Sequence, residues 1–128
     1  MAPVVIPDEL LREALTLHGR VLVRARGHSM RPLIVDGSLV EVVPCTDPNI
    51  GDVIAFFRGR RLIVHRLVAT GPSRLILRGD ATLHADPPIS LEQILGRVKH
   101  VVGPNGWELR LDTRASRWLG RAVAFVRS

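Results

Sequence analysis

The sequence predicts a mainly β protein with a short helix near each end, and three observations support that fold class. Hydrophobic residues make up 46% of the chain but aromatic residues only 4%, so the core must consist largely of Val, Leu, Ile and Ala. β-Branched side chains favour strands. Apolar runs of strand length recur along the chain, and Gly and Pro punctuate the stretches between them, as expected for strands joined by turns.

Length and charge bound the organisation of the chain. At 128 residues we expect a single domain over residues 1–128, with room for one core and not for a second. The formal net charge of +6 would suit an acidic partner such as nucleic acid or an anionic membrane. Much of the excess lies in residues 110–128, however, which contain five Arg and one Asp.

The chain has one cysteine and no long apolar run. Cys45 has no second cysteine with which to pair, so folding needs no oxidising compartment. No run approaches the roughly 18 apolar residues of a membrane span. Asp8 and Glu9 stand where a signal peptide would be basic or apolar. We therefore expect a cytoplasmic protein, or one that is peripheral at a membrane, and we expect no cofactor and no metal.

The first half of the chain is expected to contain one helix and two strands. The pattern predicts a helix over residues 8–18 that ends before a glycine. Its buried face is expected to comprise Leu10, Leu11, Ala14, Leu15 and His18. Residues 20–26 alternate apolar and basic side chains, which predicts a strand with one buried face. An Asp-Gly turn at 36–37 leads into a strand at 39–43, and two Pro and a Gly make residues 44–52 a loop.

Three further strands and a long loop follow. The apolar run at 53–57, a tight connection and the run at 62–69 predict a hairpin that carries His65. A Gly-Pro turn then leads into a strand at 74–78, and residues 79–88 are expected to form an irregular loop.

A helical turn and a second hairpin complete the predicted core. Ser90 and Gln93 form a capping pair, which predicts one or two helical turns over residues 90–95. Strands at 97–102 and 107–111 flank an Asn-Gly pair, the strongest hairpin signal in the chain.

The last stretch has the pattern of a basic amphipathic helix. Apolar residues at helical spacing are opposed by Arg over residues 113–126. Such a helix would either dock on the sheet with its charges solvated, or contact an anionic membrane or a membrane subunit.

Residues 27–32 (Gly-His-Ser-Met-Arg-Pro) carry the first candidate for chemistry. Ser29 lies where the preceding strand ends. A Ser at such a point can be held half-exposed by the scaffold beneath it, as a nucleophile must be, although Ser beside Gly and Pro is also typical of an ordinary turn. His65 and Asp86 follow downstream, and they supply a base and a carboxylate that could orient it.

Five short blocks follow one another along the chain: Gly27-x-Ser29-Met30-x-Pro32, Asp36-Gly37, Gly51-Asp52-Val53-Ile54, His65-Arg66, and Gly79-Asp80 with Asp86 six residues on. In this order they resemble the signal peptidase I superfamily, which also contains the self-cleaving repressor peptidases. The likeness runs from about residue 27 to residue 98. Other branches have Lys in the fourth block, so His65 makes the chain similar to the Ser-His form of the endoplasmic reticulum and of archaea.

This resemblance implies a compact β fold like that of the signal peptidases and repressor peptidases, with a peptidase core at about residues 20–111. It implies Ser29 as nucleophile and His65 as general base. Asp86 would be the acidic partner of the base, and Asp80 a supporting carboxylate. The N–H of the nucleophile would hold the oxyanion. The substrate would be an extended leader-like segment of a peptide or preprotein, cut after small residues.

The resemblance also implies that the substrate pairs with strand edges on both sides of the site. The residues expected to contact it are Arg26, Gly27, His28, Met30, Leu62, Ile63 and Val64. His28 could equally be a solvated neighbour. Unlike the signal peptidases, the chain is expected to have no transmembrane anchor, and Gly27 stands where many relatives have a Ser that helps to hold the oxyanion. A dedicated precursor is therefore as suitable a substrate as a translocated preprotein.

Two other function classes stay open at this point. His65, His84 and Asp86 could instead bind zinc and activate water, as in a metal-dependent hydrolase. The chain could also be a catalytically inactive module that holds an extended peptide. Nucleic-acid binding is disfavoured, because the sequence contains no platform of aromatic and basic residues and no recognisable helix-turn-helix.

Overall fold

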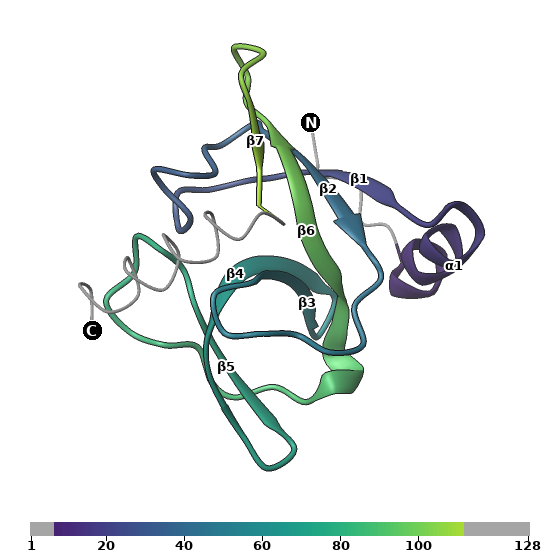
Figure 1. Cartoon of the computed structure of the whole chain (residues 1–128), viewed down its shortest axis with the longest axis vertical. Coiled ribbons are helices and arrows are strands. Elements are labelled where there is room, and N and C mark those ends of the chain that lie inside the picture. Colours follow the sequence, from purple (N-terminus) through teal and green to yellow (C-terminus); the bar gives the residue numbers. More distant parts are fainter. Residues whose placement is uncertain (1–6, 112–128) are drawn as a thin grey trace.

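The computed structural model describes residues 7–111, and these form a mainly β structure, as predicted (Figure 1). Seven strands make one sheet in the order β1-β2-β6-β3-β4-β5, with β7 paired to β6. All neighbouring strands are antiparallel. The helix expected over residues 113–126 lies outside the described residues. None of the helices within residues 7–111 has the length and apolar character that crossing a bilayer requires.

The helix α1 (Asp8–His18) begins and ends where the sequence predicts. Gly19 follows it in the left-handed conformation, with φ 74°, which is a common way to end a helix. Leu11 and Leu15 are buried. The predicted apolar face was too wide, because only a narrow stripe of a short helix can reach the core. The residues expected on that face but found exposed are Leu10 and His18.

Two strands at one edge of the sheet lead into the site. β1 (Val21–Arg24) pairs only with β2 (Leu39–Val43), so its other edge is open within the described sheet. β1 ends two residues earlier than predicted, where the chain turns away from the regular ladder. Ala25 still holds the turn, because its N–H donates to the Ser38 carbonyl and its carbonyl accepts from Gly37.

β4 (Arg61–Gly71) changes its neighbours along its length. Its first half pairs with β3 (Val53–Arg58) on one edge. Its second half, from Arg66 onward, pairs on the other edge with β5 (Arg74–Arg78). Among the described residues, the edge of β4 that faces away from β3 is therefore open from Arg61 to His65.

The helical turn before β6 is shorter than predicted. Ser90 and Gln93 do form a capping box, but the turn is a single 3₁₀ turn, η1 (Leu91–Gln93). The strand β6 (Ile94–Val102) then begins three residues earlier than expected. Ile94 and Leu95 belong to it because they alternate, one packing into each of the two hydrophobic clusters of the protein. Strand geometry satisfies that alternation and a helical turn does not.

β6 and β7 (Glu108–Arg110) form the hairpin that the Asn-Gly pair predicts. Gly106 in its turn has φ 86°, a value that glycine adopts without strain. In Figure 1 this hairpin projects at the top of the molecule, and the β4–β5 hairpin projects at the opposite end.

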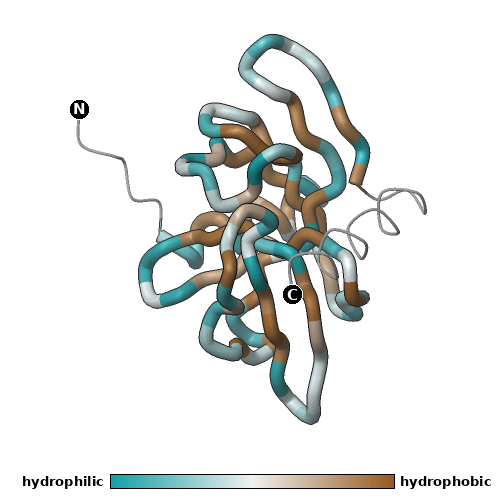
Figure 2. Tube along the Cα trace, turned by 90° about the vertical axis from the view of Figure 1, so that its left-hand side faces the viewer, coloured by the Kyte–Doolittle hydropathy of each residue, from teal (hydrophilic) through white to brown (hydrophobic). Residues whose placement is uncertain are grey.

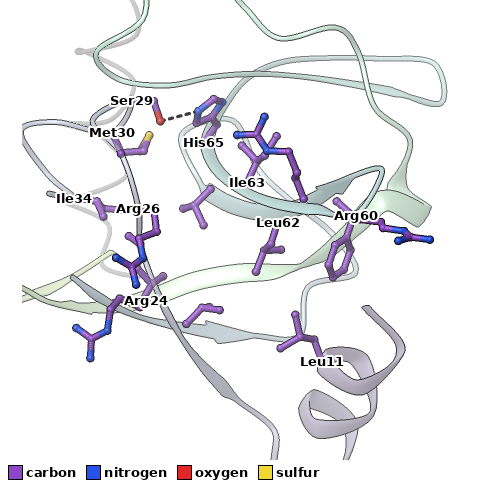
Figure 3. Close-up of a pocket in the computed structure, with 17 residues that line it drawn as sticks. Leu11, Arg24, Arg26, Ser29, Met30, Ile34, Arg60, Leu62, Ile63 and His65 are labelled. Atoms are coloured by element: carbon purple, nitrogen blue, oxygen red, sulfur yellow. Dashed lines mark hydrogen bonds between the residues drawn. The ribbon is translucent and has the colours of Figure 1, made fainter. Parts of the chain in front are cut away.

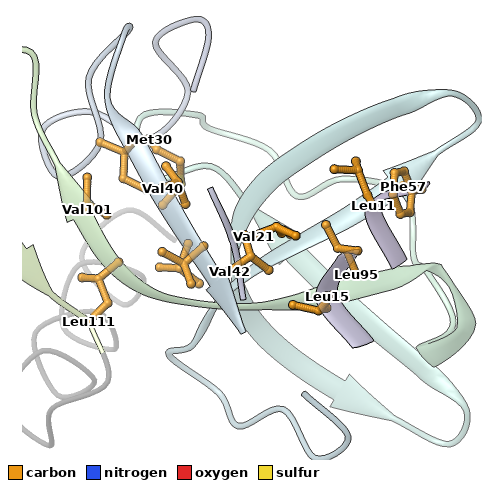
Figure 4. Packing of buried hydrophobic residues seen from close by; sticks show 14 residues of the cluster. Leu11, Leu15, Val21, Met30, Val40, Val42, Phe57, Leu95, Val101 and Leu111 are labelled. Carbon is orange, nitrogen blue, oxygen red and sulfur yellow. The ribbon is translucent and has the colours of Figure 1, made fainter. Parts of the chain in front are cut away.

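The sheet is packed on both faces, and β3 shows the arrangement most clearly. Its odd-numbered residues Val53, Ala55 and Phe57 pack into the cluster that includes α1 (Figure 4). Its even-numbered residues Ile54 and Phe56 pack into a second cluster with β5. Such a strand reads as a continuous apolar run because both of its faces are covered. In Figure 2 the hydrophobic stretches follow the strands, and the hydrophilic stretches gather at the turns.

Candidate active site

Ser29 lies in the turn that follows β1, and its neighbours hold that turn in place. Gly27 has φ 89°, and its N–H donates to Asp36 Oδ1 at 2.8 Å. Met30 is 4% exposed, and its carbonyl accepts a hydrogen bond from Ile34. The turn is therefore anchored on both sides of Ser29, whose own side chain is half-buried at the edge of a pocket.

His65 reaches Ser29 from β4. Its Nε2 lies 3.0 Å from Ser29 Oγ, as the dashed line in Figure 3 marks. The side chain of His65 is 10% exposed, and its ring packs edge-to-face with that of Phe56, with the ring centroids 6.2 Å apart. The imidazole is thus largely shielded from solvent, and its Nε2 is directed at the Ser29 hydroxyl.

Asp86 meets the other nitrogen of the same ring. Its Oδ2 is in hydrogen-bond contact with His65 Nδ1. The Asp86 N–H donates to the Leu77 carbonyl at 2.8 Å, so β5 fixes the position of the carboxylate. With a proton on Nδ1, Nε2 is free to accept the hydroxyl proton of Ser29. A Ser–His–carboxylate chain of this kind can activate a hydroxyl for attack on a carbonyl.

Asp80 lies beside these three residues and does not contact His65 through any hydrogen bond. Its two carboxylate oxygens each accept a 2.8 Å hydrogen bond from the Arg66 guanidinium, one from Nε and one from Nη2. Arg66 Nη1 also donates to the Gly51 carbonyl at 2.7 Å. The Asp80 N–H points to Met30 Sδ at 3.4 Å. This buried ion pair ties β4 to the loop that carries Asp86 and to the residue after Ser29.

Gly79 makes room for the site. A Cβ at this position would lie 2.5 Å from the Ser29 carbonyl oxygen and 3.1 Å from His65 Nε2. A side chain would therefore displace either the turn or the imidazole. Two residues further on, the Ala81 N–H donates to the Ser29 carbonyl at 2.8 Å. The loop therefore packs directly on the backbone of the candidate nucleophile.

The Ser29 N–H makes no hydrogen bond to any of residues 7–111. An N–H of the nucleophile itself is one of the donors that hold an oxyanion in acyl transfer. Gly27 offers no side-chain donor, and its own N–H is engaged by Asp36. The N–H of Ser29 itself is therefore a main-chain donor that no described residue engages.

A pocket of about 610 Å³ begins at Ser29 and His65 and extends between the two open strand edges (Figure 3). Its walls come from residues 23–27 and from residues 60–65. The residues expected to contact substrate that line it are Arg26, Gly27, Met30, Leu62, Ile63 and Val64. His28 does not line it and is exposed, so the structure gives no support to substrate contact by His28 in this pocket.

Several residues around the site were not assigned by sequence reasoning. Arg66 and Gly79 stood inside the family blocks, and their position next to His65 and Asp80 was the signal that could have found them. Arg60 lies in the turn between β3 and β4, and Arg61 is the first residue of β4, at the end of a hairpin where charged residues are ordinary. Nothing in the sequence distinguishes these two from solvated surface residues.

The metal alternative built on His65, His84 and Asp86 finds no support. Within residues 7–111, no three His, Cys, Asp or Glu side chains are grouped as a metal site requires. His84 is exposed, whereas both other residues are engaged with each other.

One comparison with known proteins found a family for this chain. The family model described as Peptidase S24-like matches residues 6–99, which is more than half of the chain. A search among curated proteins found no match.

Proposed function

Because the chain belongs to the peptidase S24-like family, we propose that it is a serine endopeptidase of the signal peptidase-like type, in the Ser-His form. Its substrate is an extended leader-like or signal-like segment, cut after small residues. One observation carries the proposal: Ser29 Oγ lies 3.0 Å from His65 Nε2 while His65 Nδ1 contacts the Asp86 carboxylate.

The proposed reaction begins with attack of Ser29 Oγ on the scissile carbonyl carbon, while His65 Nε2 takes the hydroxyl proton. The negative charge that forms on the carbonyl oxygen is held by the free Ser29 N–H, a kind of donor worth about 3 kcal/mol in the transition state. Asp86 orients the ring and stabilises the imidazolium.

The tetrahedral intermediate then collapses. The peptide C–N bond breaks, and His65 returns its proton to the leaving amine, which leaves an ester on Ser29. A water molecule gives a proton to His65 and attacks the ester carbonyl. The acid product leaves, and the proton on His65 returns to Ser29 Oγ.

The pocket supports the proposal that the substrate binds in an extended form. One wall is the edge of β1 and the segment after it, and the other wall is the open edge of β4. A peptide between two open edges can hydrogen-bond through its main chain, which gives affinity with little dependence on sequence. Its side chains then select among substrates by fitting the apolar pocket.

Covalent labelling tests the nucleophile directly. A serine-directed fluorophosphonate should add one phosphonyl group with loss of fluoride, and peptide mass mapping should locate that group on Ser29. The Ser29→Ala variant should be neither labelled nor active, with an unchanged circular dichroism spectrum. Full cleavage activity in Ser29→Ala would end the proposal. Peptide binding by the wild type, without labelling or cleavage, would identify the chain as an inactive peptide-binding module.

A further inference from the structure

The pocket beside Ser29 is lined mainly by apolar side chains, and arginine side chains stand at its rim. Its lining includes Arg24, Arg26, Arg60 and Arg61, and contains neither Asp nor Glu. Arg24 and Arg26 stand on one side of the pocket and Arg60 on the other (Figure 3). Positive charge therefore flanks the cavity on both sides.

The rim arginines have no carboxylate partners within residues 7–111. Arg24 donates only to the Gly37 carbonyl. Arg26, Arg60 and Arg61 are exposed, and their side chains make no hydrogen bond or ion pair to the described residues. Like charges around one cavity repel each other and raise its potential, so an anionic group in or beside the cavity is favoured.

Some arginines elsewhere in the described chain have partners, and two of these pair with a carboxylate. Arg12 donates to two carbonyls, Arg20 pairs with Glu41, and Arg66 pairs with Asp80. The lining of the pocket contains four arginines and no carboxylate, so no side chain of the pocket itself balances their charge.

The interior of the pocket restricts the kind of ligand that could carry a negative charge to these arginines. It is lined by aliphatic side chains, with Phe57 as its one aromatic carbon ring among the described residues. A single-stranded nucleic acid would call for several aromatic platforms, and a flat membrane surface would leave the cavity unfilled. An extended peptide fits both features, because it places apolar side chains in the cavity and charged ones at the rim.

We propose that the segment bound at Ser29 is acidic: it carries Asp or Glu on either side of small or medium apolar residues, and the rim arginines select it. The preference in cleavage rests on the proposed function, because it requires that the protein cut peptides. The preference in binding does not, because it requires only that a peptide enter the pocket. The rim arginines act as specificity-determining residues, and the main-chain pairing supplies the rest of the affinity.

A scanned set of internally quenched peptides tests the preference. All members share a central small-residue motif and differ at one position, which is Asp, Asn or Lys, moved stepwise along both flanks. At low salt, kcat/KM should be highest for Asp and lowest for Lys at the positions that reach the rim, by about fivefold for each charge step. The preference should shrink as ionic strength rises.

Charge reversal locates the preference on the protein. Arg26→Glu and Arg60→Glu should each invert the order of the Asp and Lys peptides. Arg74→Glu is the matched control, because Arg74 is exposed in the β4–β5 hairpin and does not line the pocket. It should leave the order unchanged. An inversion of the same size in Arg74→Glu would show a general charge effect and overturn the assignment to the rim.

Binding to Ser29→Ala separates this inference from the proposed reaction. Fluorescence anisotropy of the labelled peptides should give the same order of affinities, Asp above Asn above Lys, whether or not the wild type cleaves them. Equal affinities would overturn the inference while leaving the peptidase proposal intact. Displacement of the Asp peptide by an oligonucleotide or by phosphatidylglycerol vesicles, more effectively than by unlabelled Asp peptide, would also overturn it.

Discussion

Arg66 and Asp80 form a buried two-point ion pair, and each is the sequence neighbour of a residue at the candidate site. Arg66 follows His65 on β4, and Asp80 follows Gly79 in the loop that leads to Asp86. Their side chains are 1% and 2% exposed. The pair therefore fixes the distance between the strand that carries the imidazole and the loop that carries its carboxylate partner.

Asp80→Asn should destabilise the fold strongly. The substitution leaves the Arg66 charge buried without its counter-charge, which costs about 3–5 kcal/mol in comparable cases. Urea unfolding followed by circular dichroism measures the change. Arg20→Gln is the control, because it breaks the Arg20–Glu41 pair at an Arg20 side chain that is 62% exposed, and it should cost about 1 kcal/mol or less. Equal losses in the two variants would contradict the structural role given to Asp80.

Gly79→Ala should lower kcat/KM for peptide cleavage strongly, and it should lower the free energy of unfolding far less. The added methyl group would press on the Ser29 carbonyl and on His65, and a displacement of about 1 Å at reacting groups can lower the rate about 100-fold. Gly71→Ala is the matched control, because a Cβ there meets nothing within 4 Å. Wild-type kcat/KM in Gly79→Ala would show that the packing of this loop does not position the nucleophile.

Asp86→Asn should nearly abolish turnover and leave the fold intact. An amide in place of the carboxylate no longer favours the ring form with its proton on Nδ1, so Nε2 is a poorer acceptor for the Ser29 proton. In a serine peptidase the equivalent change lowers kcat about 10⁴-fold. Steady-state kinetics on a cleaved peptide measures it, with Glu13→Gln on the exposed face of α1 as control. A loss below tenfold would remove Asp86 from the mechanism.

Cys45 should react slowly with alkylating reagents in the folded protein at neutral pH. Burial raises the pKa of its thiol above the ordinary value of 9.0, and only the thiolate is nucleophilic. Labelling by iodoacetamide, followed by mass spectrometry, should be faster in urea than in buffer. Cys45→Ser should cleave peptides at the wild-type rate.

The same shift makes stability depend on pH at this residue. Because the pKa of Cys45 is higher in the folded than in the unfolded chain, its stabilising contribution is complete below 9.0 and is lost as the pH rises above that value. The free energy of unfolding of the wild type should therefore fall faster in alkaline buffer than that of Cys45→Ser. Parallel pH profiles would contradict the shift.

The local parts of the fold could be predicted from the sequence because short-range patterns determine them. The Asn-Gly hairpin, the helix ended by Gly19 and the strand Arg74–Arg78 each follow from neighbouring residues. The start of β6 could not be predicted in this way. Ser90 and Gln93 signal a helical turn, but Ile94 and Leu95 pack into opposite clusters, and only the tertiary structure shows that both faces are covered.

In the candidate site, too, some residues could be predicted from sequence motifs, and others become apparent only in the tertiary structure. Ser29, His65 and Asp86 stand in family blocks, and in the fold their side chains form one chain of contacts; their catalytic roles are the proposal that the variants test. The arginine rim has no motif, since Arg24 ends β1 and Arg60 lies in the β3–β4 turn, and only the sheet topology brings the two to one cavity. Sequence spacing carries no information about such a meeting.

The change of neighbours along β4 has a consequence for where a bound chain would be cut. A peptide that adds to the free edge of Arg61–His65 cannot continue past Arg66, because β5 already occupies that edge. The last position at which it can pair with β4 is therefore beside His65. The position of the scissile bond would then be determined by the point at which the added strand must stop. The peptide residues beyond that point would not be held by this edge of β4.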